Sequence, residues 1–119
     1  MDERRKFVRA PVQVDVQYAA LPDGMNQMTH TKDLSAGGAC VVTKDPLPAE
    51  AKLQVAIQLP EQPPVNAIAE PVWTSTTEVT GQGPAQCAVE TGLRFTEIAP
   101  QDRNALIAYV AKSLRVLQL

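Results

Sequence analysis

The chain has 119 residues, of which 45% are hydrophobic and 20% charged, so it is long enough and apolar enough to fold as one domain around its own core. This composition excludes intrinsically disordered and collagen-like proteins. Eleven basic residues against thirteen acidic ones give a formal net charge of −2, which argues against a protein that coats nucleic acid through its overall charge. A site for an anion would therefore have to be formed by basic residues gathered in one part of the chain.

Cysteine content and hydropathy indicate the compartment. Cys40 and Cys87 are the two cysteines, and neither lies in the C-x-x-C spacing of a zinc or redox site, so both are expected to be reduced and buried. No apolar run approaches the roughly 18 residues that a membrane span requires, and the N-terminus lacks the apolar stretch of a signal peptide. We expect a cytoplasmic protein with no membrane span.

The ten prolines favour strands and turns over helices through most of the chain. Apolar and polar residues alternate over 11–18, which predicts a half-buried strand, and Leu21-Pro22-Asp23-Gly24 predicts the turn after it. In the fifth expected strand, Pro71 predicts a bulge or a sheet edge, because proline cannot donate to a ladder. The strands expected after the first, bounded by turns rich in glycine and proline, are 25–32, 39–43, 52–59, 65–73 and 86–95.

The hydrophobic period changes at Pro100, which suits the first position of a helix. Apolar residues then recur at three- and four-residue spacing, which predicts an amphipathic helix over 100–119. Six short antiparallel strands can cover their apolar face only if the sheet closes on itself. The expected fold is therefore a mostly-β, six-stranded antiparallel barrel over 11–99, with the helix packed on its wall or mouth. Trp73 is expected in the core, although a tryptophan at a strand end could instead belong to a docking surface.

The first candidate site is the N-terminus, where four of the eleven basic residues lie within nine positions. Taken alone, such a tail is commonly a solvated segment that aids solubility. Arginine, however, is always charged, forks onto phosphate oxygens or the O6/N7 edge of guanine, and stacks flat on a base. Residues 1–10 are therefore a candidate ligand-binding segment, expected to be flexible without ligand. The basic residues are Arg4, Arg5, Lys6 and Arg9.

The second candidate is Asp33-Leu34-Ser35-Ala36-Gly37-Gly38, between the second and third expected strands. In a plain polar turn, Asp33 and Ser35 bond the local backbone and the glycines take positive φ. In a binding site, Asp33 accepts from the N1 and N2 hydrogens of guanine, Ser35 bonds a phosphate or a base, and the glycines let a ligand approach the backbone. Residue chemistry alone leaves both interpretations open.

Catalysis has little support, since the single histidine, His30, lies in an expected strand and no serine stands in a nucleophile-elbow pattern. His30 and the cysteines form no metal-ligand spacing. A barrel that binds single-stranded nucleic acid needs aromatic stacking platforms and a basic groove, and 4% aromatic residues with a negative net charge disfavour it. We expect no enzyme, no metal, no resident cofactor and no nucleic-acid partner.

Together, the two candidate segments resemble the signatures of the PilZ domain family. Arg5-Lys6-Phe7-Val8-Arg9 matches R-x-x-x-R, and Asp33-x-Ser35-x-x-Gly38 matches [D/N]-x-S-x-x-G, in the same order and with two expected strands between them. The likeness continues at Gly92-Leu93-Arg94-Phe95 and at the helix start near Pro100. Residues 44–80 match only in their strand pattern.

The resemblance implies a six-stranded barrel that binds the bacterial second messenger cyclic di-GMP. Arg5 and Arg9 would clamp the phosphates and the guanine Hoogsteen edges of the ligand. Arg4, directly before the signature, implies an intercalated pair of cyclic di-GMP molecules on one chain. The residues that would hold a guanine from the barrel surface are Asp33, Ser35 and Gly38, with Gly37 beside them.

For signalling, the resemblance implies a stand-alone adaptor. The arginine-rich segment would become ordered over the nucleotide and so present a new surface to an unidentified effector, a motility, polysaccharide or signalling protein. The alternative within the family is a protein-interaction module whose nucleotide site is unused.

Overall fold

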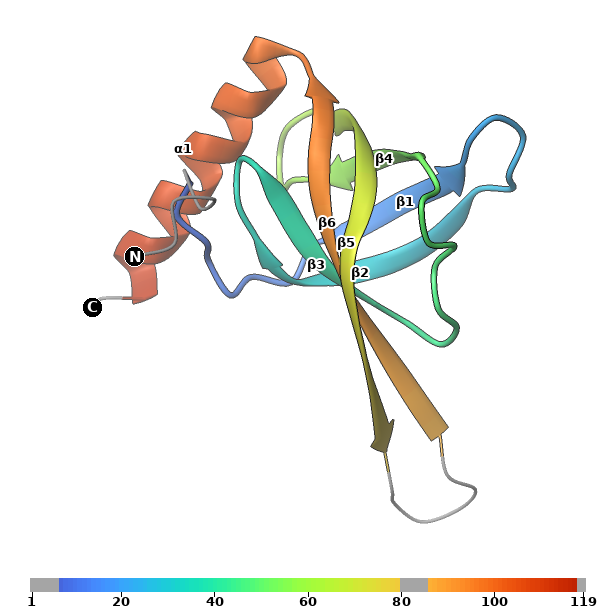
Figure 1. Cartoon of the computed structure of the whole chain (residues 1–119). Coiled ribbons are helices and arrows are strands. Elements are labelled where there is room, and N and C mark those ends of the chain that lie inside the picture. Colours follow the sequence, from blue (N-terminus) through green and yellow to red (C-terminus); the bar gives the residue numbers. More distant parts are fainter. Residues whose placement is uncertain (1–6, 80–85, 118–119) are drawn as a thin grey trace.

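The computed structural model describes residues 7–79 and 86–117 as a barrel of strands with one helix (Figure 1). All neighbouring strands pair antiparallel, and they close in the order β1-β2-β3-β6-β5-β4. The expected six-stranded antiparallel barrel with a C-terminal helix is confirmed. The elements in chain order are β1 (Asp15–Ala20), β2 (Gln27–Leu34), β3 (Gly38–Thr43), β4 (Leu53–Gln58), β5 (Val65–Val79), β6 (Gln86–Ile98) and α1 (Pro100–Leu117).

Apolar and polar side chains alternate along the strands, and the apolar ones fill the inside of the barrel. In β4, Leu53, Val55 and Ile57 are each 1% exposed, whereas Gln54 and Gln58 between and after them face solvent. Successive side chains of a strand point to opposite faces, so closure of the sheet buries every second residue. Burial of the apolar face from each strand stabilises the closed barrel against the open sheet.

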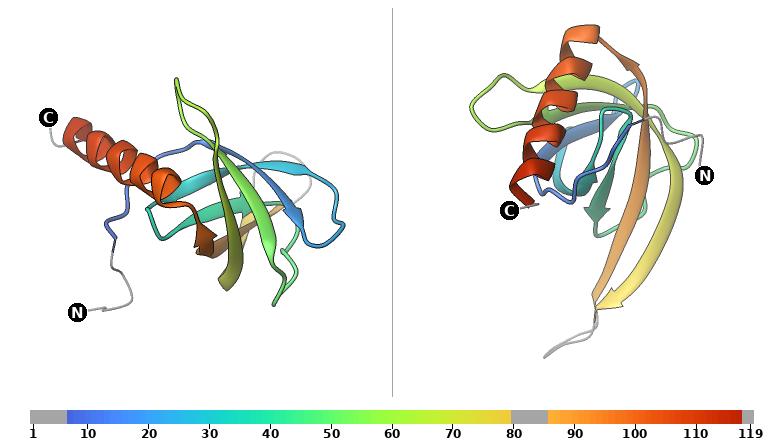
Figure 2. Two further views of the ribbon diagram at one scale, coloured as in Figure 1. Left: turned by 90° about the horizontal axis from the view of Figure 1, so that it is seen from above. Right: turned by 90° about the vertical axis from the view of Figure 1, so that its left-hand side faces the viewer.

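The helix α1 lies beside the β2–β3 turn and the chain that leads into β1 (Figures 1 and 2). Leu106 is fully buried, Val110 is 4% exposed, and both belong to the same hydrophobic core as the barrel. At the start of α1, the Asp102 carboxylate accepts a hydrogen bond from the Asn66 N–H at 3.4 Å. Within the described residues, the structure has no helix that is both long and apolar enough to cross a bilayer.

The first two strands differ in their bounds from the prediction. β1 begins at Asp15 rather than at residue 11, and β2 covers Gln27–Leu34 rather than 25–32. The residues just before β1 do follow β2, and Thr31 holds them: its N–H donates to Val14 O at 2.9 Å, while its hydroxyl donates to Val12 O at 2.7 Å and accepts from Val14 N–H at 3.0 Å. Bonds made at this one residue fasten the segment without making a continuous ladder.

The last two strands are longer than predicted. β5 continues to Val79 rather than ending at Trp73, and β6 continues to Ile98 rather than ending at Phe95. Beyond the barrel they pair only with each other and form a hairpin that projects from it (Figure 1). Pairing of threonines in the hairpin explains why β5 does not end at Trp73. The added end of β6 pairs instead with Ala67 and Ile68 of β5.

A bulge in β5 reverses the orientation expected for Trp73. Pro71 pairs with Leu93 and Trp73 pairs with Gly92, so the register shifts by one residue between them and confirms the bulge predicted at Pro71. Trp73 therefore lies on the outer face of the barrel and is 41% exposed. The prediction that Trp73 belongs to the core is wrong, because the usual burial of tryptophan does not take account of the register shift, which turns this residue outward.

Candidate functional site

The N-terminal segment is fastened to the end of β2 immediately after Arg9. Ala10 is fully buried, its N–H donates to Leu34 O at 2.9 Å, and the Leu34 N–H donates to Ala10 O at 3.0 Å. Two backbone bonds between one pair of residues form an isolated antiparallel bridge. The bridge brings Arg9 beside the C-terminal end of β2.

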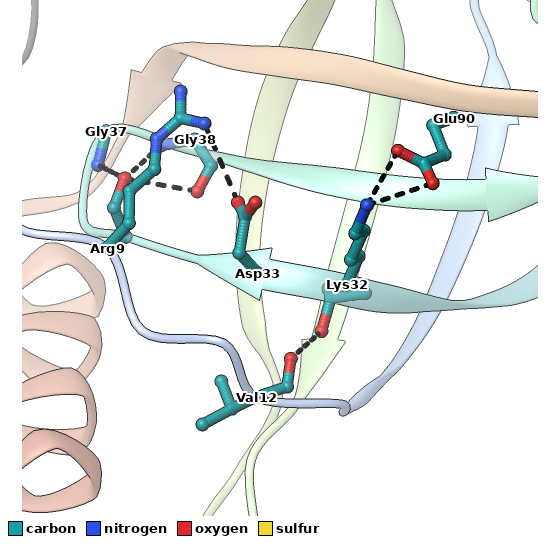
Figure 3. Close-up of polar contacts among 9 residues, drawn as sticks. Arg9, Val12, Lys32, Asp33, Gly37, Gly38 and Glu90 are labelled. Carbon is teal, nitrogen blue, oxygen red and sulfur yellow. Dashed lines mark hydrogen bonds and ion pairs between the residues drawn. The ribbon is translucent and has the colours of Figure 1, made fainter. Parts of the chain in front are cut away.

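Arg9 and Asp33, one from each candidate segment, lie next to each other (Figure 3). Arg9 Nη1 is 3.7 Å from Asp33 Oδ1, and the two side chains are 36% and 26% exposed. This distance is that of an ion pair without a hydrogen bond. Asp33 Oδ1 is buried and has no hydrogen-bond partner within the described residues. A buried acceptor without a donor costs free energy, so this carboxylate is prepared to accept from a ligand.

The Ser35 hydroxyl shapes the turn between β2 and β3. It accepts from the N–H groups of Gly37 and Gly38, both at 3.1 Å, and lies 3.2 Å from the Gly38 carbonyl, to which it donates. The local backbone bonds predicted for Ser35 are therefore confirmed. Asp33 makes no such bond in the part of the chain that is described, because its side chain points to the outer face toward Arg9.

Gly37 and Gly38 are required for close approach rather than for backbone conformation. Neither has a positive φ, so that part of the prediction is wrong. A Cβ at Gly38 would be 2.1 Å from the Leu93 carbonyl oxygen of β6, and a Cβ at Gly37 would be 2.9 Å from Phe7 Cδ2. Both are shorter than side-chain contacts allow. Glycine therefore lets β6 and the N-terminal segment pack against this turn.

A row of paired residues continues from Asp33 across the outer face of the barrel. The next three positions are Cys40 in β3, Gly92 in β6 and Trp73 in β5. A Cβ at Gly92 would be 2.1 Å from Trp73 Nε1, so the indole rests on the glycine backbone. The row has a carboxylate at one end and a half-exposed aromatic ring at the other. Trp73 is the site residue that sequence reasoning missed, although the Pro71 bulge was a signal for it.

Cys40, within this row, is a free thiol that is 1% exposed, as expected from the sequence. Burial raises the pKa of Cys40 above its ordinary value, and the negative charges of Asp33 and Glu90 add to this effect. The thiol is therefore protonated at neutral pH. The side chain of Cys87 lies outside the described residues.

A surface ion pair borders the row (Figure 3). Lys32 Nζ is 3.1 Å from both carboxylate oxygens of Glu90. The hydrogen bond and the charge of Glu90 raise the pKa of Lys32, whose side chain is 59% exposed. Solvent screens such an exposed pair, so it contributes little to the stability of the fold.

The predicted site residues that the structure describes lie close together, some exposed and some buried beneath the turn. Arg4 and Arg5 lie outside the described residues. Their signature partner Arg9 follows the described residues Phe7 and Val8 and is held at the end of β2 by the Ala10 bridge. The predicted residues that the structure brings together are Arg9, Asp33, Ser35, Gly37 and Gly38.

Comparison by sequence identifies one domain family. A family model described as the PilZ domain matches residues 3–112. No curated protein matches the chain.

Comparison by structure finds similar barrels. The PilZ domain of YcgR from Escherichia coli, in a structure with c-di-GMP, is 21% identical with a TM-score of 0.68, and the match covers 98% of each chain. The Bacillus subtilis inhibitor of motility, MotI/DgrA, is 26% identical with a TM-score of 0.71, over 98% of this chain and 53% of that one. Apo MrkH of K. pneumonia is 15% identical with a TM-score of 0.79, and the match covers 99% of this chain and 54% of MrkH. The present chain thus spans about half the length of MotI and MrkH.

Proposed function

The chain belongs to the PilZ domain family, and on that basis we propose that it is a receptor for cyclic di-GMP rather than an enzyme. The observation that carries the proposal is the contact of Arg9 with Asp33, which joins the two signature segments on one surface. A guanidinium can donate to the O6/N7 edge of guanine, and a carboxylate can accept from its N1 and N2 hydrogens. Structures of YcgR and MrkH with c-di-GMP share this fold and support the proposal.

In the proposed complex, Arg5 and Arg9 clamp the phosphates and the Hoogsteen edges of guanine, while Asp33 holds a guanine from the barrel surface. A half-exposed ion pair at 3.7 Å contributes little free energy, so the ligand replaces the contact of Arg9 with Asp33 at low cost. Ser35 and Gly38 support the site by shaping the turn beside Asp33: the hydroxyl is bonded to backbone N–H groups, and the absence of a Cβ lets Gly38 pack against the Leu93 carbonyl of β6.

Trp73 extends the proposed surface beyond the two signatures. Its indole contacts Gly92 in the same outer row as Asp33, and Trp73 is 41% exposed. Stacking of a base on an exposed aromatic ring is favourable and independent of hydrogen-bond direction. We assign to Trp73 a contact with a guanine, and to Arg4 a contact with the second molecule of an intercalated cyclic di-GMP pair.

For signal output, we propose that the arginine segment becomes ordered over the bound nucleotide and presents a new surface to an effector protein. The basic residues directly precede the buried Ala10, so they can fold over a ligand while the chain remains attached at that bridge. The 26% identity with an inhibitor of motility makes a motility protein the first effector to test, before polysaccharide and signalling proteins. In this proposal the protein acts as a cytoplasmic adaptor between cyclic di-GMP and the effector.

Calorimetric titration with cyclic di-GMP, with cyclic di-AMP and GTP as controls, tests the proposal. We expect saturable binding of cyclic di-GMP alone, with two molecules per chain. Saturation at one molecule would contradict the intercalated pair but not the receptor function. Absence of binding would leave the alternative, a protein-interaction module with an unused nucleotide site.

A further inference from the structure

Phe7, in the middle of the arginine signature, is held between the β2–β3 turn and α1. Its Cδ2 is 2.9 Å from the position of a Cβ on Gly37, so the ring lies against the glycine. On the helix, the Arg103 guanidinium carbon is 5.5 Å from the centroid of the same ring. The Phe7 side chain is half-buried and packs against the hydrophobic core. These contacts hold it from two elements that are far apart in the sequence.

We propose that Phe7 is a positioning residue of the ligand site, an inference that rests on the proposed receptor function. Phe7 has no side-chain group that can hydrogen-bond a nucleotide. Its ring fixes the chain two residues before Arg9, while the Ala10 bridge fixes it one residue after. Arg9 is therefore held between two anchors and faces Asp33 before any ligand is present. Such preorganisation lowers the conformational entropy lost on binding.

This inference gives Gly37 a different role from the one implied by the signature. Gly37 occupies a variable position of [D/N]-x-S-x-x-G, and its N–H and carbonyl groups bond Ser35 Oγ and the Phe95 N–H at 3.1 and 2.9 Å. The absence of a Cβ leaves the space that the Phe7 ring fills. Gly37 therefore serves the ligand through Phe7 rather than by touching it.

The ring of Phe7 also connects the site with α1. Arg103 Nε is buried and has no hydrogen-bond partner within the described residues, so the face of Phe7 provides a favourable surface for this guanidinium. A movement of Phe7 changes that contact. Ligand binding at Arg9 is therefore expected to alter the environment of Arg103, although Arg103 is not assigned to the ligand.

The test compares Phe7→Ala, Phe7→Leu, Gly37→Ala and the double variant Phe7→Ala/Gly37→Ala by calorimetric titration with cyclic di-GMP. We expect Phe7→Ala to weaken binding roughly tenfold through lost preorganisation, and Phe7→Leu to weaken it less because leucine still packs. Gly37→Ala should weaken binding by displacing the ring. In the double variant the loss should not exceed that of Phe7→Ala, because no ring remains to be displaced.

Amide hydrogen exchange of the ligand-free protein tests whether Phe7 anchors the N-terminal segment, independently of ligand binding. Exchange of the Ala10 and Leu34 amides, each of which donates to the carbonyl of the other residue, should be faster in Phe7→Ala than in the wild type, with global thermal unfolding little changed. Unchanged affinity or unchanged exchange in Phe7→Ala would overturn the positioning role, and additive losses in the double variant would do the same. If the wild type itself does not bind cyclic di-GMP, the receptor function fails, while the exchange experiment still decides whether Phe7 anchors the segment.

Discussion

The indole of Trp73 lies on the backbone of Gly92, where even a methyl group would be 2.1 Å from Nε1. The pair results from the bulge at Pro71, which turns Trp73 to the outer face of the barrel. It places the single tryptophan of the chain in the same row of paired residues as Asp33.

Gly92→Ala is expected to displace Trp73 and to weaken cyclic di-GMP binding by about 1 kcal/mol, the lower end of the range for stacking on one base. Because the chain has one tryptophan, its fluorescence reports the displacement directly, as a shift of the emission maximum. Ser75→Ala, at an exposed position on the same face of β5, is the matched control. Unaltered emission and affinity in Gly92→Ala would show that Trp73 is not part of the site.

Arg9→Ala should reduce the affinity for cyclic di-GMP by about 1 to 3 kcal/mol, the scale of a charged hydrogen bond left unmade, and Arg5→Ala should do likewise. Arg9→Lys retains the charge but not the planar fork, so we expect an intermediate loss. Calorimetry measures all three. Lys52→Ala is the control, because it removes an exposed positive charge at a position outside the candidate site. The backbone carbonyl of residue 52, which accepts from Leu21 N–H at the β1–β2 turn, is kept in the variant. An equal loss in Lys52→Ala would indicate a non-specific charge effect.

Thr31→Val should lower the free energy of unfolding by about 1 to 3 kcal/mol, because the isosteric side chain leaves two backbone groups without their partner. In the native protein those groups are Val12 O and Val14 N–H. Urea denaturation provides the measurement. Thr96→Val is the control, since the exposed Thr96 hydroxyl makes a single bond, to Ile68 O at 3.2 Å. Equal effects of the two substitutions would contradict the role assigned to Thr31.

The free energy of unfolding should fall at alkaline pH partly because of Cys40. Burial raises the pKa of this thiol in the folded state, so the folded chain keeps a proton that the unfolded chain releases above about pH 8.5. The stabilising contribution is complete below that pH and is lost as the pH rises through the folded-state pKa. Urea denaturation between about pH 7 and pH 10 should show a steeper decline for the wild type than for Cys40→Ala. Parallel declines would disprove the assignment.

Local patterns in the sequence were sufficient to predict most elements of the fold. Alternation at period two identifies residues such as Leu53, Val55 and Ile57 as one face of a strand, and the change of period at Pro100 identifies the helix. These signals depend on neighbours along the chain. The two signatures were equally visible, because a binding motif is a short pattern of residue types. Their meeting at Arg9 and Asp33 depends on the isolated bridge between Ala10 and Leu34, which is separate from the strand pairings that close the barrel.

Contacts between distant segments were decided by the tertiary structure. The outward position of Trp73 depends on the register of β5 against β6, and the need for glycine at Gly38 depends on the Leu93 carbonyl across the sheet. Phe7 meets Gly37 and Arg103 only after α1 has packed on the barrel. Periodicity shows which residues share a face, whereas register, bulges and close approach are set by which strands become neighbours, and this information is absent from any local window of the chain.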